Sequence, residues 1–299
     1  MTPKPRHGAL LLLVTLVLAP AIPARDMAGV EITTVPVAPG LHMLVGRGGN
    51  IAVLHGPDGV LLVDDQYAPL TDKIRAAVTA LHPGPIRFVV NTHWHGDHTG
   101  GNENLGGSGA VIVAHDKVRE RMSVEQVMRI RGQAVPASPA LALPVITFRE
   151  EVGFHMNGVR VQVQHVAAAH TDGDAILWFE GRDAVHMGDT YFNGMYPFID
   201  VDSGGGVNGM IDAVNGVLAR ASDATRIIPG HGPLSRREEL ETYRDMLVAV
   251  RDRVSQGLAQ GRSIDEIVAG KPTADLDATW GGGFMKADDF LRLVAAGLR

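Results

Sequence analysis

Short apolar runs separated by turn residues occupy the first part of the chain and predict β-strands. The runs cover residues 41–45, 51–54 and 60–63, and the turn sequence Gly56-Pro57-Asp58-Gly59 joins the last two. Strands of this length with tight turns between them are typical of antiparallel hairpins. We therefore expect an antiparallel sheet at the start of the fold.

A helix and further strands are predicted next. Thr71 is the expected N-cap of a helix that carries one apolar face and ends before Pro83-Gly84. Residues 86–90 and 110–114 are apolar and predict buried strands. The order of strand, helix and strand indicates that the first sheet continues beyond its hairpins.

The second half of the chain predicts another sheet. A helix over residues 117–131 and a Pro-rich segment over 136–144, which is either a lid or a connection, lead to it. Four apolar runs then form a second set of strands, which cover residues 145–148, 159–166, 175–179 and 184–187. The later elements are a helix over 210–220, a short strand over 226–228, a long amphipathic helix over 236–258 and a helix that starts at the capping box Ser263–Glu266. Two halves of strands and helices that share one core predict an α/β sandwich.

The first 24 residues predict a secretory signal rather than part of the fold. Lys4 and Arg6 precede an apolar run over residues 9–19, and small residues follow it. The alternative, a membrane anchor, is disfavoured because the run is shorter than the ~20 residues that span a bilayer. We expect cleavage after Ala21 or Ala24, a mature domain over residues 25–299 with C-terminal helices, and a periplasmic or secreted protein that is not bound to a membrane.

Composition narrows the chemistry. The chain has no cysteine, which excludes disulfides, thiolate metal ligands and cysteine nucleophiles. The formal net charge of −6 argues against a nucleic-acid partner. A small molecule is therefore the expected substrate or ligand, and the sequence leaves the oligomeric state open.

The strongest chemical signal follows the predicted strand at residues 86–90. Residues 91–98 read Asn-Thr-His-Trp-His-Gly-Asp-His, which places His93, His95, Asp97 and His98 on one loop. Imidazole and carboxylate groups are ligands that divalent zinc, iron and manganese accept. Four ligands this close in sequence cannot all bind one tetrahedral ion, so the motif predicts two metal ions.

This motif resembles the hallmark of the metallo-β-lactamase superfamily, in which His-x-His-x-Asp-His follows a strand. The resemblance implies a four-layer αβ/βα sandwich, and three later residues match the remaining family ligands in order. It implies that one metal is held by His93, His95 and His170, that the other is held by Asp97, His98 and His231, and that Asp189 bridges the two.

The resemblance also implies the reaction. Two divalent cations, most simply zinc with iron or manganese as alternatives, polarise a water to hydroxide and stabilise the oxyanion formed when it attacks a carbonyl. Asp97 is the expected catalytic residue, because it would orient the hydroxide or receive its proton. Asp64 is a weaker candidate that would either fix a histidine tautomer or serve as a simple turn aspartate. Asp172 and Asp174 would either orient the loop of His170 or form an ordinary turn. Tyr191 either faces the substrate or packs in the core.

The substrate class stays open at this point. Position 189 is not a cysteine, and Phe192 stands where typical cysteine-containing β-lactamases of the family carry a lysine. The bridging aspartate resembles glyoxalase II and lactonases, so a lactam, lactone, ester or thioester fits a β-lactamase-like hydrolase. The alternatives are an iron-dependent oxidoreductase of the same fold, similar to persulfide dioxygenases, and a metal-binding protein without enzyme activity.

Overall fold

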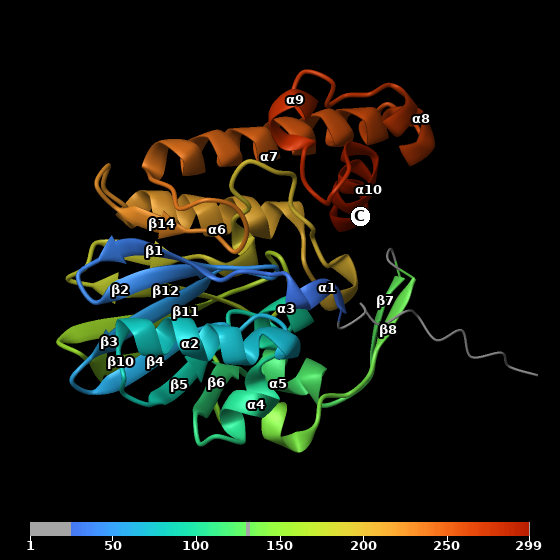
Figure 1. The fold of residues 1–299 in the computed structure, drawn as a ribbon. Coiled ribbons are helices and arrows are strands. Elements are labelled where there is room, and N and C mark those ends of the chain that lie inside the picture. The colour runs from blue at the N-terminus through green and yellow to red at the C-terminus, as the bar shows by residue number, and fades with distance from the viewer. Residues whose placement is uncertain (1–24, 130–131, 299) are drawn as a thin grey trace, which may run out of the picture.

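The computed structural model describes residues 25–129 and 132–298, and the predicted signal at residues 1–24 lies outside them. Two β-sheets pack face to face, with helices on both outer sides (Figure 1). The strands of the first sheet, in spatial order, are β1 (Thr33–Ala38), β2 (Leu41–Val45), β3 (Ile51–Gly56), β4 (Gly59–Val63), β5 (Ile86–Val90), β6 (Val111–His115) and β9 (Ile146–Phe148). Those of the second are β10 (Glu151–Met156), β11 (Val159–Val166), β12 (Asp174–Glu180), β13 (Ala184–His186) and β14 (Arg226–Ile228).

Strand direction decides where the functional loops meet. The strands β1 to β4 are antiparallel neighbours, as the hairpin pattern predicts, whereas β4, β5, β6 and β9 run parallel. In the second sheet β13 and β14 are also parallel. The loops that leave the carboxyl ends of parallel strands collect at one edge of the sheet. The His-rich loop after β5 and the loops after β13 and β14 therefore come together.

The space between the sheets holds one apolar core. Along β11 the side chains alternate, so that Val161 and Val163 are buried in this core while Gln162 and Gln164 point to the other face. Leu54 and Val63 of the first sheet pack in the same cluster. The alternation expected for a strand with one face on a core is confirmed.

Helices cover the two outer faces. The first sheet is covered by α2 (Thr71–Leu81), whose Ile74 and Val78 pack on it, and the second by α6 (Val207–Arg220), α7 (Arg237–Ala259) and α10 (Ala287–Gly297). The shorter helices are α1 (Arg25–Ala28), α3 (Gly96–Thr99), α4 (Asn102–Gly106), α5 (Asp116–Met122), α8 (Ile264–Ala269) and α9 (Asp277–Trp280). The four-layer αβ/βα sandwich is confirmed. In the part of the chain that the structure describes, no helix is both long and apolar enough to cross a membrane.

The predicted helix over residues 117–131 is wrong beyond Met122. After α5 the chain forms a hairpin of β7 (Gln126–Met128) and β8 (Gln133–Val135), which lies outside the two sheets (Figure 1) and packs Met128 in one cluster with Trp94 and Val118. The hydroxyl of Ser123 donates to the carbonyl of Arg119 at 2.6 Å, and the amide of Gln126 donates to the carbonyl of Arg121. Polar side chains thus occupy the terminal carbonyls and end the helix.

Two other expectations need correction. The run at 145–148 belongs to the first sheet, because β9 pairs in parallel with β6. The Pro-rich segment before it is a connection: Asn102 of α4 donates to the carbonyl of Ala142 at 2.9 Å, which holds the chain beside the free edge of β6. Thr71 is the first residue of α2 rather than its N-cap, since its hydroxyl donates to the carbonyl of Ala68 in the preceding 3-10 turn.

Candidate metal centre

Five chain segments bring the predicted ligands to one place. His93 and His95 lie on the loop after β5, and Asp97 and His98 are in α3, the short helix that continues this loop. The other three residues each follow a strand of the second sheet: His170 after β11, Asp189 in the 3-10 turn after β13, and His231 after β14. All seven are thus gathered at the carboxyl edge, in two groups suited to hold metal ions.

The first group is buried and tightly convergent. Nδ1 of His95 lies 3.1 Å from Nε2 of His93 and 2.8 Å from Nε2 of His170. Oδ2 of Asp189 is 3.8 Å from Nε2 of His93 and 3.5 Å from Nε2 of His170. Three imidazole nitrogens and one carboxylate oxygen therefore face a common point.

The second group lies against the first through the same aspartate. Oδ1 of Asp189 is 3.0 Å from Nε2 of His98, and Oδ2 is 3.4 Å from Nε2 of His231. Asp97 completes the group, with its Oδ2 at 3.3 Å from Nε2 of His231. The carboxylate of Asp189 thus lies between the two groups.

Partners behind the histidines fix where their protons reside. Nδ1 of His170 is 2.8 Å from the carbonyl oxygen of Phe198, and Nε2 of His95 is 2.9 Å from a carboxylate oxygen of Asp200. Both partners accept hydrogen bonds, so each of these ring nitrogens must carry the hydrogen. The opposite nitrogens, Nε2 of His170 and Nδ1 of His95, then present lone pairs to each other at 2.8 Å.

Asp64 sets the same pattern for the other two histidines of the loop. It accepts hydrogen bonds at 2.7 Å from the backbone N–H of Thr92, the hydroxyl of Thr92 and Nδ1 of His98. Because the hydroxyl of Thr92 donates to Asp64, it is free to accept from Nδ1 of His93 at 3.0 Å. His98 and His93 therefore also direct their Nε2 lone pairs inward.

Convergent lone pairs in a buried site repel one another unless a cation lies between them. His93, His98 and His170 are at most 1% exposed, so water does not relieve this repulsion. Oδ1 of Asp189 is likewise buried without a hydrogen-bond partner among the described residues. The donor set of imidazoles and carboxylates suits divalent metal ions.

The pKa values reflect two different surroundings. Burial lowers the pKa of His170 to about 4, although Asp189 opposes this. Burial also lowers the pKa of His231, but Asp189 and Asp97 outweigh it and raise the value to about 9. The pKa of Asp189 is held well below its usual range, because its histidine neighbours outweigh the effect of burial. The second group thus concentrates negative charge that a cation would compensate.

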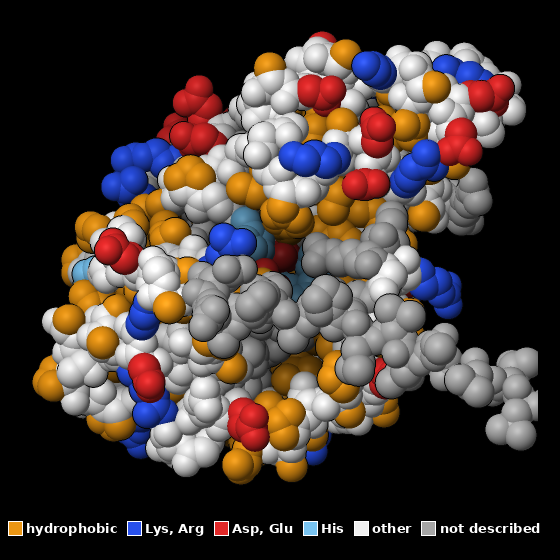
Figure 2. Space-filling model, turned by 45° about the vertical axis from the view of Figure 1, so that its right-hand side comes forward, with side chains coloured by type: hydrophobic (Ala, Val, Ile, Leu, Met, Phe, Trp, Pro, Cys, Tyr) orange, Lys and Arg blue, Asp and Glu red, His pale blue; other side chains and the backbone are white. Residues whose placement is uncertain are grey.

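A cavity of about 540 Å³ opens onto this centre. Asp97, Asp189 and His231 form part of its wall, with Arg47 and an apolar rim around them. Figure 2 shows histidine and acidic side chains at the bottom of a hollow, with hydrophobic side chains along its upper border. The apolar and aromatic members of the wall are Tyr67, Trp94, Met128, Val135, Phe198 and Phe284.

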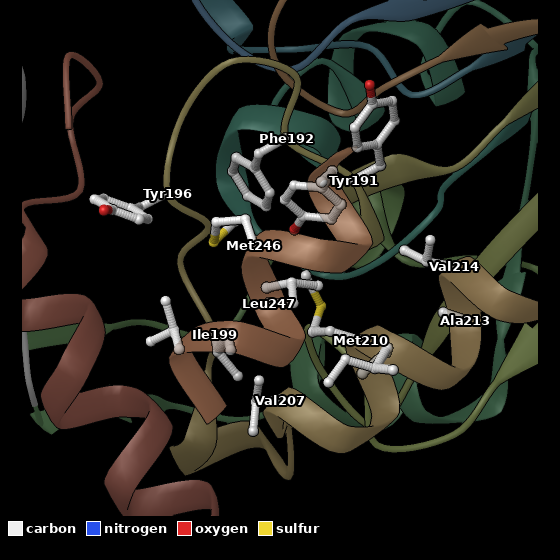
Figure 3. Packing of buried hydrophobic residues seen from close by; sticks show 14 of the residues in the cluster. Tyr191, Phe192, Tyr196, Ile199, Val207, Met210, Ala213, Val214, Met246 and Leu247 are labelled. Carbon is white, nitrogen blue, oxygen red and sulfur yellow. The ribbon is translucent and has the colours of Figure 1, made fainter. Parts of the chain in front are cut away.

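Some predicted residues have other roles. Tyr191 is fully buried and packs against Tyr243 in the cluster between the second sheet and its helices (Figure 3), so the packed alternative holds. Its neighbour Phe192 stacks on the ring of His231, with centroids 5.2 Å apart. Asp174 accepts from the backbone N–H of His170 and shapes that loop.

Two features that shape the metal centre were not predicted from the sequence. Asp200 orients His95 across 105 residues of sequence, and no local pattern marks it. The sequence Gly46-Arg47-Gly48-Gly49 carries a visible signal, since glycines cluster where a backbone must approach another group closely. A side chain at Gly49 would collide with the ring of His98.

Comparisons with known proteins agree with this geometry. The sequence profile of the Metallo-beta-lactamase superfamily matches residues 44–233. A hydroxyacylglutathione hydrolase of Polaromonas sp. (strain JS666) is 28% identical over 165 residues, which are 54% of this chain and 55% of that protein. Another from Anaeromyxobacter dehalogenans is 30% identical over 52% of this chain and 51% of its own length. The chain thus spans about half the length of these curated relatives.

Solved structures share the fold at low identity. A metallo-beta-lactamase from Pontibacter korlensis superimposes with a TM-score of 0.60 at 15% identity, over 73% of this chain and 99% of that one. The sec-alkylsulfatase Pisa1 from Pseudomonas sp. gives a TM-score of 0.65 at 19% identity, over 91% of this chain and 50% of that one. These similarities describe the arrangement of the elements and not the substrate.

Proposed function

Because the chain belongs to the metallo-beta-lactamase superfamily, we propose that it is a hydrolase that uses two divalent metal ions to cleave an acyl bond. The observation that carries this proposal is the position of Asp189. Its two oxygens lie between the inward nitrogens of two histidine groups, which is where a bridging carboxylate would hold both ions. A single iron, as in the oxidoreductase alternative, would use only part of this ligand set.

Some residues of the centre would bind the metal ions, and Asp97 would also orient the attacking water or accept its proton. His93, His95 and His170 would hold one ion, and Asp97, His98 and His231 the other. When bound, the ions would supply an acidified water and positive charge for a developing oxyanion. Asp97 is in the cavity wall, where its carboxylate would orient that water or accept its proton.

Esters and thioesters are the first substrates to test. The hydroxyacylglutathione hydrolases matched in sequence support an acyl-bond substrate, and the bridging position of Asp189 is compatible with them. Lactones and lactams are also candidate substrates, because attack by the same water would open their rings. The apolar wall of the cavity suits a substrate with an apolar body.

Export is a separate part of the proposal and rests on the first 24 residues. A basic start, an apolar run and small residues support a cleaved secretory signal. N-terminal sequencing of protein recovered from the periplasm or medium should give a chain that begins after Ala21 or Ala24. Recovery from the cytosol with Met1 intact would contradict export and leave the hydrolase proposal untouched.

The hydrolase proposal is tested by metal content and turnover together. Purified protein loaded with zinc should hold about two ions per chain and hydrolyse at least one member of a panel of thioesters, esters, lactones and lactams. His231→Ala should lose both an ion and the activity, whereas His155→Ala, at an exposed position on β10, should keep both. One iron per chain, or two bound zinc ions without turnover of any panel member, would refute the proposal.

A further inference from the structure

Arg47 is a charged residue of the cavity wall that forms no ion pair among the described residues. It lies in the loop between β2 and β3, is exposed, and lines the same cavity as Asp97, Asp189 and His231. Within the described part of the chain, its guanidinium has no hydrogen-bond or ion-pair partner. Among the described residues that line this cavity, Arg47 is the only arginine or lysine. An unpaired guanidinium is thus presented to whatever enters.

The backbone that carries Arg47 is held on both sides. The buried amide of Gln66 donates to the carbonyl of Gly49 at 2.8 Å, and the N–H of Gly49 donates to the carbonyl of Asp97 at 3.1 Å. A Cβ at Gly48 would lie 2.6 Å from the same carbonyl oxygen of Asp97. The glycines therefore let the loop lie directly on the ligand helix α3, which fixes the base of the Arg47 side chain.

The same loop is tied to the other ligand group through Asn50. Its side-chain amide donates to the carbonyls of Pro229 and Gly232, each at 2.9 Å, and its backbone N–H donates to the carbonyl of Gly230 at 2.7 Å. These bonds enclose His231 on both sides. Arg47 thus has a fixed starting point relative to both His98 and His231, although its own side chain is exposed.

The cavity is chemically asymmetric, and this asymmetry indicates a ligand. Trp94, Met128 and Phe284 give it apolar walls, and Arg47 supplies one fork of hydrogen-bond donors in the wall. A guanidinium recognises groups with two or more anionic oxygens in a planar or tetrahedral arrangement. We propose that Arg47 binds an anionic group of the substrate, such as a carboxylate, while the bond to be cleaved lies at the metal centre.

This inference rests on the proposed function and makes its substrate class more specific. The substrate would be an acyl compound with an apolar body and a separate acid group. The acid group would contribute to ground-state binding and orientation, not to the bond-breaking step. Loss of Arg47 should therefore raise KM for acidic substrates more than it lowers kcat.

Binding of simple acids tests the inference without turnover. Phenylsuccinate carries two carboxylates and 3-phenylpropionate one, on similar apolar bodies, and isothermal titration on the zinc-loaded protein gives both affinities. The wild type should prefer phenylsuccinate by about two- to fivefold, the value expected for one exposed ion pair. Arg47→Ala should lose this preference, and Arg47→Lys should retain part of it.

A matched control separates a local contact from net charge. Arg262→Ala removes another exposed arginine, which lies in the turn between α7 and α8 and is not in the cavity wall, and should leave the preference intact. Equal affinities for the two acids in the wild type, no binding of either acid, or a preference that survives Arg47→Ala would each overturn the inference.

Turnover distinguishes failure of the inference from failure of the proposed function. If p-nitrophenyl acetate and mono-p-nitrophenyl succinate are both hydrolysed, Arg47→Ala should raise KM for the succinate ester alone. If KM for both esters rises equally, anion recognition by Arg47 is refuted while the hydrolase stands. If neither ester nor any other acyl compound is cleaved and the acid preference still depends on Arg47, the hydrolase fails and the anion site stands.

Discussion

The replacement of Asp64 by asparagine tests the idea that outer partners fix the ligand histidines. Asp64 is fully buried, and both of its oxygens accept hydrogen bonds at 2.7 Å from donors on Thr92 and His98. Its φ of 64° lies in the left-handed region, which asparagine tolerates better than other residues with a side chain. Asp64→Asn therefore changes the hydrogen bonding and leaves the backbone unstrained.

The amide cannot satisfy the three donors in either orientation. If its oxygen faces the N–H of Thr92, its NH2 group faces Nδ1 of His98, and that ring must move its hydrogen to the inward Nε2. If the amide is turned, its NH2 group faces the N–H of Thr92. A buried unsatisfied donor costs about 1–3 kcal/mol, and loss of an outer partner of a metal ligand costs roughly 10–100-fold in metal affinity.

Two measurements check this prediction. Denaturant unfolding of the metal-free protein should show a loss of about 1–3 kcal/mol, and zinc titration should show the second ion bound at least about tenfold more weakly. Asp65→Asn is the matched control. Burial raises the pKa of Asp65 well above its usual range, so an uncharged amide is a conservative replacement at this position.

The Asp65→Asn control distinguishes a lost hydrogen bond to His98 from a general loss of packing. Asp65→Asn should leave zinc affinity within about twofold of wild type, because Asp65 contacts the backbone of Gly101 and not a ligand ring. If Asp64→Asn binds two zinc ions as tightly as the wild type, its hydrogen bonds do not set the tautomer of His98. If both variants weaken zinc equally, the effect is a general loss of packing.

Three further predictions concern the ligands and the pH dependence. Asp189→Asn should weaken the second zinc ion by about 10–100-fold or more, because an amide cannot offset the repulsion between two dications; wild-type titration and turnover would contradict a bridging role. His170→Ala and His231→Ala should each leave about one zinc ion per chain, in different sites, by elemental analysis and by anomalous diffraction; two ions in either variant would remove that residue from the ligands. Burial and the stacked ring of His165, whose centroid lies 3.7 Å away, lower the pKa of His115 below its ordinary value near 6.5. The neutral form of His115 therefore stabilises the fold above pH 6.5, and this contribution is lost as the pH falls below that value. The melting temperature should therefore fall between pH 7.5 and 5.5 by less in His165→Gln than in the wild type, and an equal fall would contradict the pairing.

The sequence alone determined the features that depend on neighbouring residues. The alternation over residues 159–166 predicts β11 to the residue, since a strand with one face on a core leaves a period of two in the sequence. The capping box at Ser263 is formed as predicted, because both of its hydrogen bonds join residues three apart. The motif at residues 93–98 likewise marks its loop without any knowledge of the fold.

The tertiary structure decided what depends on distant partners. β9 joins the first sheet where α4 holds its connection beside the edge of β6, through a hydrogen bond between Asn102 and Ala142, which lie 40 residues apart. This contact leaves no periodic trace in the chain.

The same limit applies to the metal centre. The residue types and their order could be predicted from the sequence, but the inward direction of the lone pairs could not. Asp200 lies 105 residues from His95, and Asp64 lies 34 residues from His98. Arg47 acquires its place in the cavity wall only because glycines beside it let the loop lie on the ligand helix. A hydrogen bond between distant residues imposes no spacing on the sequence, so only the folded chain shows which carboxylate orients which ring.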